Sequence, residues 1–278
     1  AGILVALGTL GNMVATTPLV LLVEQVGWRV SFQLIAMINL FLTISFFGVV
    51  RDEPVDSDED PAATASSLNS RQAFNNLKQL FRRKEYWIIS LSTFTRYGIF
   101  AAFQALWAGP YLMEVVGLSA LTTGNLILIL NVGMILGSAS WGAISDRLFR
   151  TRKWLVIAGT LGMAVSIILI SELSATTPFA AQAALFFCFG YFNAAGLLMY
   201  PHIKDLVPAE MSGAAMTGIN FFTMIGPAVF LQGLGTLMQT LYPEASRGAA
   251  AFFTAFVVCI ACLGLVAILY CFTDENGD

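Results

Sequence analysis

Charged residues are scarce in this sequence, and their scarcity excludes most classes of water-soluble protein. Only 11% of the 278 residues are Asp, Glu, Lys or Arg, whereas a soluble domain has about 25%. Hydrophobic residues make up 57% of the chain, and the mean hydropathy is +0.77. The net charge of -3 provides no basic face for the phosphate backbone of a nucleic acid. We therefore expect an integral membrane protein rather than a soluble enzyme or a nucleic-acid binder.

Residue types that commonly carry catalysis or bind metals are also rare. The one histidine is His202, and the four cysteines are Cys188, Cys259, Cys262 and Cys271. Cys259 and Cys262 have a metal-like spacing, but no other ligand is near them in the sequence, so we interpret all four as free thiols packed in the membrane. The sequence shows no paired carboxylates, catalytic triad or Gly-rich phosphate loop. We expect neither an enzyme nor an ATP-driven pump, and no metal or other cofactor.

Long apolar runs are the feature that the sequence does have. A helix of roughly 20 apolar residues crosses a bilayer core about 30 Å thick. Runs of this length cover residues 2–23, 30–50, 86–113, 115–145, 154–171, 173–203, 211–243 and 248–273, and Arg96 is the one charge inside them. They lack the two-residue alternation of barrel strands. We therefore predict an all-α, polytopic membrane protein with eight transmembrane helices.

Basic residues are distributed unevenly among the connections, and this predicts the orientation. Eleven of the 14 lie in alternate connections, namely Arg51, Arg71, Lys78, Arg82, Arg83, Lys84, Arg147, Arg150, Arg152, Lys153 and Lys204. Arg29 and Arg247 lie in the other connections. Because Lys and Arg favour cytoplasmic loops, we expect the basic set and both ends of the chain to face the cytoplasm, in a bacterial-type inner membrane.

One connection is long and hydrophilic. Residues 51–60 are mainly acidic and small polar residues follow, a composition typical of a flexible linker. Residues 68–84 place Leu77 and Leu80 on one helical face and Lys78 toward another, which indicates either a helix on the cytoplasmic leaflet or a simple tether. We divide the chain into residues 1–50, a cytoplasmic linker with an amphipathic helix over 51–85, and a six-helix unit over 86–278. Six spans after a long loop are typical of the second half of a two-repeat transporter.

A charged motif ends the fourth apolar run. Residues 142–153 read Gly-Ala-Ile-Ser-Asp-Arg-Leu-Phe-Arg-Thr-Arg-Lys. This resembles the Gly-x-x-x-Asp-Arg-x-x-Arg-Arg/Lys loop signature of the major facilitator superfamily, with Phe149 where the family often has Gly. The signature joins the second and third helices of each half in that family, and it has this place after the linker here. The resemblance implies helices five to twelve of a twelve-helix protein, whose partners are the bilayer and the first four helices of the same protein.

The resemblance also implies a gating role for Gly142, Asp146, Arg147 and Arg150. A carboxylate at a helix C-terminus is unfavourably placed for the dipole of its own helix. Asp146 therefore needs a positive partner, either one of the arginines or the N-terminus of the helix that begins near Met211. In the family, the contact with that neighbouring helix closes the cytoplasmic gate. The alternative is that the basic residues only anchor the topology.

Polar side chains within the spans are costly in a bilayer and mark candidate substrate-binding residues. The candidates are Arg96, Gln104, Trp107, Asn131, Tyr191, Asn193 and Asn220. Each Asn could equally make hydrogen bonds between helices. Arg96 lies roughly 15 Å from the cytoplasmic end of its helix at 1.5 Å per residue, close to the midplane.

Arg96 begins a stripe in which Phe100, Gln104, Trp107 and Tyr111 follow at helical spacing. Because Arg pairs bidentately with phosphate or carboxylate, the stripe predicts a small anionic solute. The stretch from Arg96 to Ile99 also resembles the seventh helix of glycerol-phosphate and hexose-phosphate permeases, in which the Arg contacts phosphate. Alternatively, Arg96 extends to the membrane surface or pairs with a carboxylate in helices outside this chain.

These observations favour a secondary active transporter that moves a small solute, an organic anion, by alternating access. Two other readings remain open: an exporter of drugs or hydrophobic solutes, and a transporter-like membrane sensor. An exporter would have a greasier cavity with acidic residues, and no carboxylate lies within a predicted span. A sensor would use its cytoplasmic loops, including residues 51–85, to contact a partner.

Overall fold

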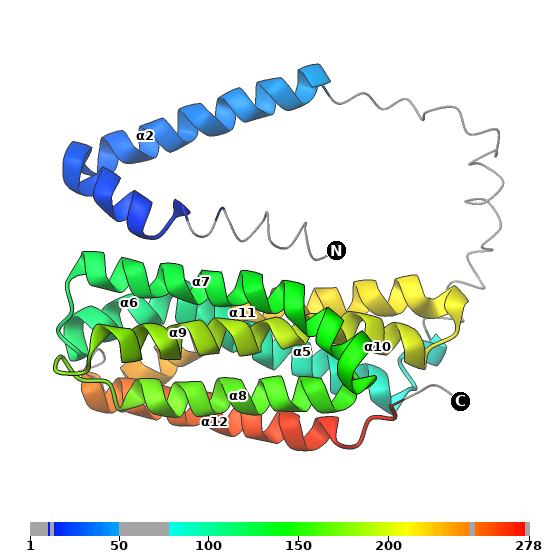
Figure 1. The fold of residues 1–278 in the computed structure, drawn as a ribbon. Helices are drawn as coiled ribbons and strands as arrows, with labels where there is room; N and C mark the ends of the chain where they lie inside the picture. Colours follow the sequence, from blue (N-terminus) through cyan, green and yellow to red (C-terminus); the bar gives the residue numbers. More distant parts are fainter. Residues whose placement is uncertain (1–10, 12–13, 50–77, 245–247, 276–278) are drawn as a thin grey trace.

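A computed structural model describes residues 11, 14–49, 78–244 and 248–275 of the chain (Figure 1). Every regular element in these ranges is helical, as the apolar runs predict. The first part of the chain forms α2 (Thr17–Val49), α5 (Lys84–Ala102), a π-helical turn (Phe103–Trp107), α6 (Ala108–Pro110) and a second π-helical turn (Tyr111–Val115). The rest forms α7 (Ala120–Ala143), a π-helical turn (Ile144–Phe149), α8 (Lys153–Ser171), α9 (Phe179–Ala194), a 3₁₀ turn (Ala195–Leu198), α10 (Met199–Leu206), α11 (Ala209–Leu241) and α12 (Ala249–Tyr270).

Six helices within the described ranges are long and apolar enough to cross a membrane. They cover Thr17–Gly48, Ala120–Phe149, Lys153–Ser171, Phe179–Leu206, Ala209–Leu241 and Ala249–Tyr270. The count differs from the predicted eight for two reasons. Residues 2–10 and 12–13 of the first predicted span lie outside the described residues, and the end of that span continues into the segment Thr17–Gly48, in which Gly27 has a non-helical conformation (φ 78°, ψ 159°) before the second predicted span. Helix α5 carries Lys84, Glu85 and Arg96 and is not among the six.

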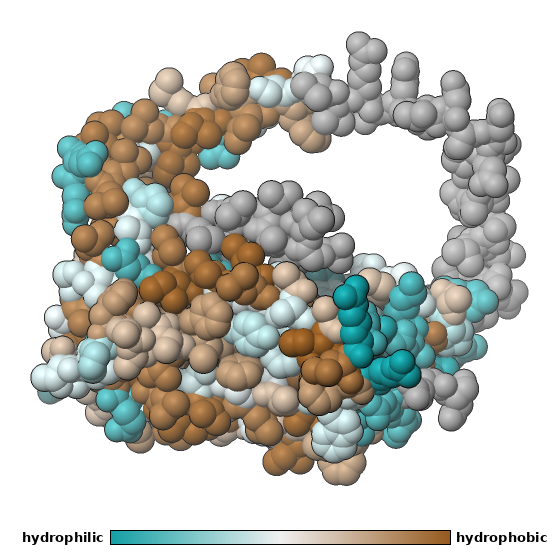
Figure 2. Space-filling model, in the orientation of Figure 1, coloured by the Kyte–Doolittle hydropathy of each residue, from teal (hydrophilic) through white to brown (hydrophobic). Residues whose placement is uncertain are grey.

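Helix α2 lies beside the other helices and contacts them near its N-terminal end (Figure 1). There the Thr17 hydroxyl lies 2.8 Å from Asn125 Oδ1 of α7 and donates a hydrogen bond to it. Beyond Gly27, apolar side chains such as Phe32, Phe41 and Phe47 are exposed, and Figure 2 shows this part of the surface as largely hydrophobic. Such a surface is suited to lipid or to other membrane helices rather than to water.

The remaining long helices form one bundle in which α5 packs most extensively against α11, and α7 against α9 (Figure 1). Both contacts bring backbones together at glycines. A Cβ atom added at Gly226 of α11 would lie 2.2 Å from the carbonyl oxygen of Phe94, and one at Gly190 of α9 would lie 2.0 Å from that of Leu130. Small residues at such crossings allow the close packing on which membrane helices depend.

Hydrophilic groups gather at the end of the bundle where α5 and α8 begin and α12 ends. Lys153 Nζ donates to the Thr273 carbonyl oxygen at 2.6 Å. His202 is fully buried, with Nδ1 2.7 Å from Tyr270 Oη and Nε2 3.0 Å from the Asp274 carbonyl oxygen. It therefore lies in the contact between α10 and the C-terminal end of α12. Of the predicted linker and its amphipathic helix, residues 51–77 lie outside the described residues. Leu80, just after them, is buried in the bundle.

Candidate functional site

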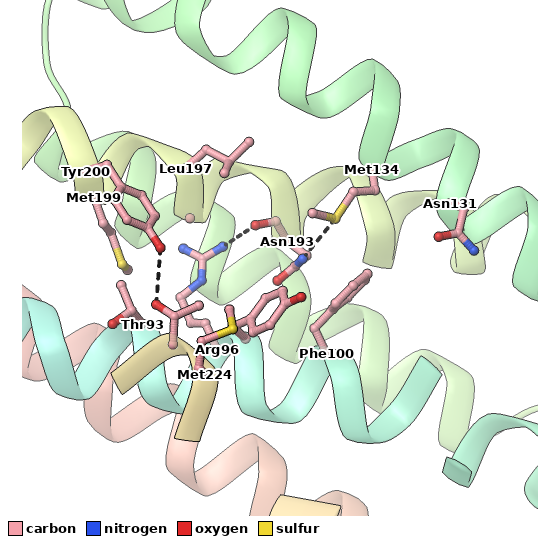
Figure 3. Close-up of a pocket in the computed structure, with 13 residues that line it drawn as sticks. Thr93, Arg96, Phe100, Asn131, Met134, Asn193, Leu197, Met199, Tyr200 and Met224 are labelled. Carbon is pink, nitrogen blue, oxygen red and sulfur yellow. Dashed lines mark hydrogen bonds between the residues drawn. The ribbon is translucent and has the colours of Figure 1, made fainter. Parts of the chain in front are cut away.

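A cavity of about 360 Å³ lies within the bundle, at the level of Arg96 (Figure 3). Its walls come from α5, α7, α11 and the segment that runs from α9 through the 3₁₀ turn into α10. Apolar side chains such as Phe100, Met134 and Met224 form much of the lining. The polar residues in the lining are Thr93, Arg96, Tyr97, Asn131, Asn193, Tyr200 and Thr223. A mostly apolar hollow with a few convergent polar groups is the usual form of a small-molecule site.

Arg96 is only 2% exposed, and its guanidinium bonds to neutral oxygens of two neighbouring helices. Nη1 donates to the Val156 carbonyl oxygen at 3.2 Å and to Thr160 Oγ1 at 3.1 Å, both on α8. Nη2 donates to the carbonyl oxygens of Phe192 and Asn193 on α9, at 2.9 and 3.2 Å. Arg96 therefore does not extend to the membrane surface, contrary to one alternative above.

Two features of this arrangement leave the guanidinium incompletely satisfied. Nε of Arg96 has no hydrogen-bond partner among the described residues. Within the same ranges the salt bridges join Lys84 to Glu85 and Asp274, and Arg152 to Asp205, and none includes Arg96. A buried cation without an anionic partner is costly. The cavity wall thus contains a positive charge that lacks a counter-charge.

The predicted stripe on α5 holds for its first half only. Phe100 lines the cavity, and Gln104 Nε2 donates to Asn131 Oδ1 at 2.8 Å. Trp107 instead packs against the Phe252 ring, with centroids 6.2 Å apart, and Tyr111 donates to the Ile170 carbonyl oxygen at 2.8 Å. The structure therefore does not bring Trp107 or Tyr111 to the cavity. The cause is the π-helical turn Phe103–Trp107, because its wider turn rotates the residues that follow.

The remaining polar candidates fall into two groups. Asn131 and Asn193 line the cavity, and Asn193 Nδ2 lies 3.1 Å from Met134 Sδ. Tyr191 lies in the α7–α9 contact instead, where its hydroxyl accepts a hydrogen bond from Ser140 at 3.1 Å. Asn220 is exposed and accepts from the hydroxyl of Tyr200 at 3.1 Å, so it reaches the cavity only through Tyr200.

Four polar cavity residues were not expected from the sequence, namely Thr93, Tyr97, Tyr200 and Thr223. Tyr200 and Thr223 approach each other across the α10–α11 contact, with hydroxyl oxygens 3.3 Å apart. Thr93 lies one helical turn before Arg96, and this spacing was a usable signal. Tyr200 precedes Pro201 near the end of an apolar run, and nothing in the sequence marks it as a cavity residue.

A second cavity, of about 580 Å³, lies between α2, α5 and α7. Gln104 and Thr123 line it, and Tyr97 lines both cavities. The Gln104–Asn131 hydrogen bond joins a residue of this lining to a residue of the first. The two cavities are thus adjacent, with Tyr97 and the hydrogen-bonded side chains of Gln104 and Asn131 between them.

The charged loop motif is exposed at the end of α7. Residues Ile144–Phe149 form a π-helical turn, and Arg150 follows in the left-handed conformation (φ 50°). The side chains of Asp146, Arg147 and Arg150 are exposed and make no hydrogen bond or ion pair with the part of the chain that the structure describes. The expected contact of Asp146 with the start of α11 is therefore absent.

The nearby ion pair joins Arg152 to Asp205 and ties the start of α8 to α10. Gly142 has open space around it, with no atom within 4 Å of an added Cβ.

The sequence matches the model of the Major Facilitator Superfamily twice, over residues 1–231 and 89–276, and the chain belongs to this family. It is similar to the probable sulfoacetate transporter SauU of Cupriavidus necator, with 24% identity over 249 residues, 82% of this chain and 56% of that protein. The glycerol-3-phosphate transporter of Bacillus subtilis is 26% identical over 258 residues, 84% of this chain and 53% of that protein. The putative transporter AraJ of Escherichia coli is 27% identical over 237 residues, 84% and 54% of the two chains.

These similarities confirm the sequence-based resemblance to the family. The chain is a multi-pass membrane protein of a transporter family, whose place in bacteria is the inner membrane. It spans about half the length of the curated relatives it matches.

Proposed function

We propose that these residues form the substrate-binding part of a secondary active transporter for a small organic anion. The observation that carries the proposal is Arg96, a buried cation in the wall of a 360 Å³ cavity with no carboxylate partner in the described residues. An oxyanion in the cavity would supply the missing negative charge and could accept two parallel hydrogen bonds from a guanidinium. Asn131, Asn193 and the hydroxyl groups would then orient the rest of the solute.

The relatives support the anionic class, because the names of two of them refer to sulfoacetate and glycerol 3-phosphate, which are both organic anions. The described cavity residues include no carboxylate, so nothing there favours the cationic solutes that many exporters move. We further propose that transport proceeds by alternating access, with residues 1–50 as helices of one repeat, 51–85 as the cytoplasmic linker and 86–278 as the other repeat.

Binding to the protein in lipid nanodiscs tests the substrate class. We expect saturable binding of radiolabelled glycerol 3-phosphate or sulfoacetate, because each carries an oxyanion of a size that fits the cavity. Glycerol is the matched neutral probe, since it keeps the hydroxyl groups and lacks the charge. Equal binding of glycerol and glycerol 3-phosphate, or binding of neither anion, would contradict the proposal.

The loop motif gives a separate prediction about the cytoplasmic gate. In the described state the Asp146 carboxylate is exposed. We propose that in the opposite state of the transport cycle Asp146 holds the cytoplasmic gate shut. Asp146→Asn removes the charge and keeps the shape. We expect the cytoplasmic side to become more accessible to a thiol reagent, measured at a cysteine introduced at Tyr200. The unfolding temperature should stay within about 2 °C of the parent, because surface substitutions change stability little.

Two variants serve as controls in the gate experiment. Gly142→Ala adds a methyl group in open space, so its unfolding temperature should also match that of the parent. Lys204→Gln removes an exposed charge from the same side of the membrane and outside the motif, and it should leave thiol labelling unchanged. Labelling that is equal in Asp146→Asn and in the parent would reduce Asp146 to an ordinary loop residue.

A further inference from the structure

The side of the Arg96 guanidinium that an oxyanion would bind also donates hydrogen bonds to the backbone at the break between α9 and α10. A guanidinium binds an oxyanion side-on through Nε and Nη2, whose N–H bonds are parallel. In this structure Nε has no partner, whereas Nη2 donates to the carbonyl oxygens of Phe192 and Asn193 and lies 3.6 Å from Met163 Sδ. An incoming oxyanion therefore finds one free donor and one occupied donor.

The two carbonyl groups belong to the last turn of α9, where the helix narrows to the 3₁₀ turn Ala195–Leu198 before α10 begins. In a continuous α-helix, the carbonyl of Phe192 would accept from the Gly196 amide, and that of Asn193 from the Leu197 amide. Instead, the Ala195 amide bonds back to Phe192 and Asn193. Arg96 thus bonds to two carbonyl groups at the helix break.

The surroundings of the guanidinium are built to fit this position. A Cβ added at Gly196 would lie 3.6 Å from Arg96 Cζ, and one at Gly159 of α8 would lie 2.4 Å from the Cβ of Ala195 and 3.5 Å from Arg96 Nη2. The absence of a side chain at Gly159 therefore lets α8 and the 3₁₀ turn pack closely beside the guanidinium, whereas a Cβ at Gly196 would make an ordinary van der Waals contact. Thr160 accepts from Nη1 and in turn donates to the Val156 carbonyl oxygen at 2.7 Å, which fixes the opposite edge of the guanidinium.

We propose that the acidic group of the substrate binds Nε and Nη2 of Arg96, displaces the Asn193 carbonyl, and so converts the break at residues 195–198 toward a continuous helix. This inference rests on the proposed function and adds a mechanism to it. Thr160 is a positioning residue, because it holds Nη1 on α8 while the opposite edge exchanges partners. The site then favours anions with two adjacent oxygens, such as carboxylates, phosphates and sulfonates, over a single-point anion such as chloride.

Hydrogen–deuterium exchange on the nanodisc-embedded protein tests the coupling. Glycerol 3-phosphate and sulfoacetate at saturation are expected to slow exchange of the Gly196 and Leu197 amides on the order of fivefold, because the 3₁₀ turn in which both lie exchanges its poorer hydrogen-bond geometry for that of an α-helix. These residues line the cavity, so their amides lie at a surface that water can reach. Chloride at the same ionic strength should leave the exchange unchanged. Anion binding that leaves the exchange at these two amides unchanged, or speeds it, overturns the inference and leaves the proposed function standing.

Variants of Thr160 test the positioning role. Thr160→Val keeps the shape and removes one of the two acceptors of Nη1, so anion affinity should fall about tenfold and the exchange response should shrink. Thr160→Ser restores the oxygen and should restore both. Ser166→Ala is the matched control, because the Ser166 hydroxyl is buried on the same helix and bonds to Gly162 of α8. Normal affinity and exchange response in Thr160→Val overturn the positioning role, and failure of the parent to bind either anion overturns this inference together with the proposed function.

Discussion

Replacing Arg96 with Lys or Gln is expected to weaken binding of organic anions by at least about a hundredfold, a loss of about 2.7 kcal/mol. Hydrogen bonds to charged groups contribute about 1.5–3 kcal/mol each, and the guanidinium offers two in parallel. Lysine keeps the charge but presents it on a flexible chain without a planar fork. It also cannot replace the five hydrogen bonds that Arg96 makes to α8 and α9. Gln removes the charge altogether.

The loss of binding should not come from unfolding. Burial of an unpaired cation is itself costly, so Arg96→Gln removes that cost together with the hydrogen bonds, and we expect an unfolding temperature close to that of the parent. Size-exclusion chromatography and thermal unfolding check this point. Arg82→Lys, at an exposed position outside the cavity, is the matched control for the substitution and should bind normally. Normal anion binding by Arg96→Lys would contradict both the site and the substrate class.

The sequence predicted Arg96 as a site residue because a lone charge within an apolar run is easily recognised. It did not predict the partners of Arg96, which are mainly backbone carbonyl groups of α8 and α9. Every residue has a carbonyl, so no side-chain pattern identifies the ones that a distant guanidinium will contact. The tertiary packing of α5, α8 and α9 determines which carbonyl groups Arg96 contacts.

The helices themselves follow from hydropathy, yet their irregular turns do not. Gly109 and Pro110 indicate a disturbed helix in the sequence, but they give no sign of π-helical turns on both sides of α6. The first of those turns contains both Gln104, which lines the second cavity, and Trp107, which packs against Phe252. An extrapolation at 3.6 residues per turn fails where the helix has more residues per turn. The exposed loop motif was recognised by its residues, whereas its lack of partners in the described state is a matter of conformation.

Among the Gly→Ala substitutions in the bundle, Gly190→Ala is expected to lower the stability of the protein the most. The added Cβ would lie 2.0 Å from the Leu130 carbonyl oxygen and 2.9 Å from its carbon, and both are backbone atoms that cannot rotate away. Helices α7 and α9 must therefore separate. Overpacking of this kind costs about 1–3 kcal/mol or more. We expect a lower unfolding temperature and a reduced yield of monodisperse protein.

The same substitution should also weaken anion binding, because the α7–α9 contact sets the cavity. Asn131 directly follows Leu130, and Asn193 lies one turn beyond Gly190, so a shift of either backbone moves two of the polar lining groups. Gly264→Ala on α12 is the control, since an added Cβ there meets no atom within 4 Å. It should be neutral or slightly stabilising, because Ala favours a helix over Gly by about 1 kcal/mol. If Gly190→Ala unfolds at the same temperature as Gly264→Ala and binds the anion equally well, the backbone contact of α7 with α9 does not determine the geometry of the site.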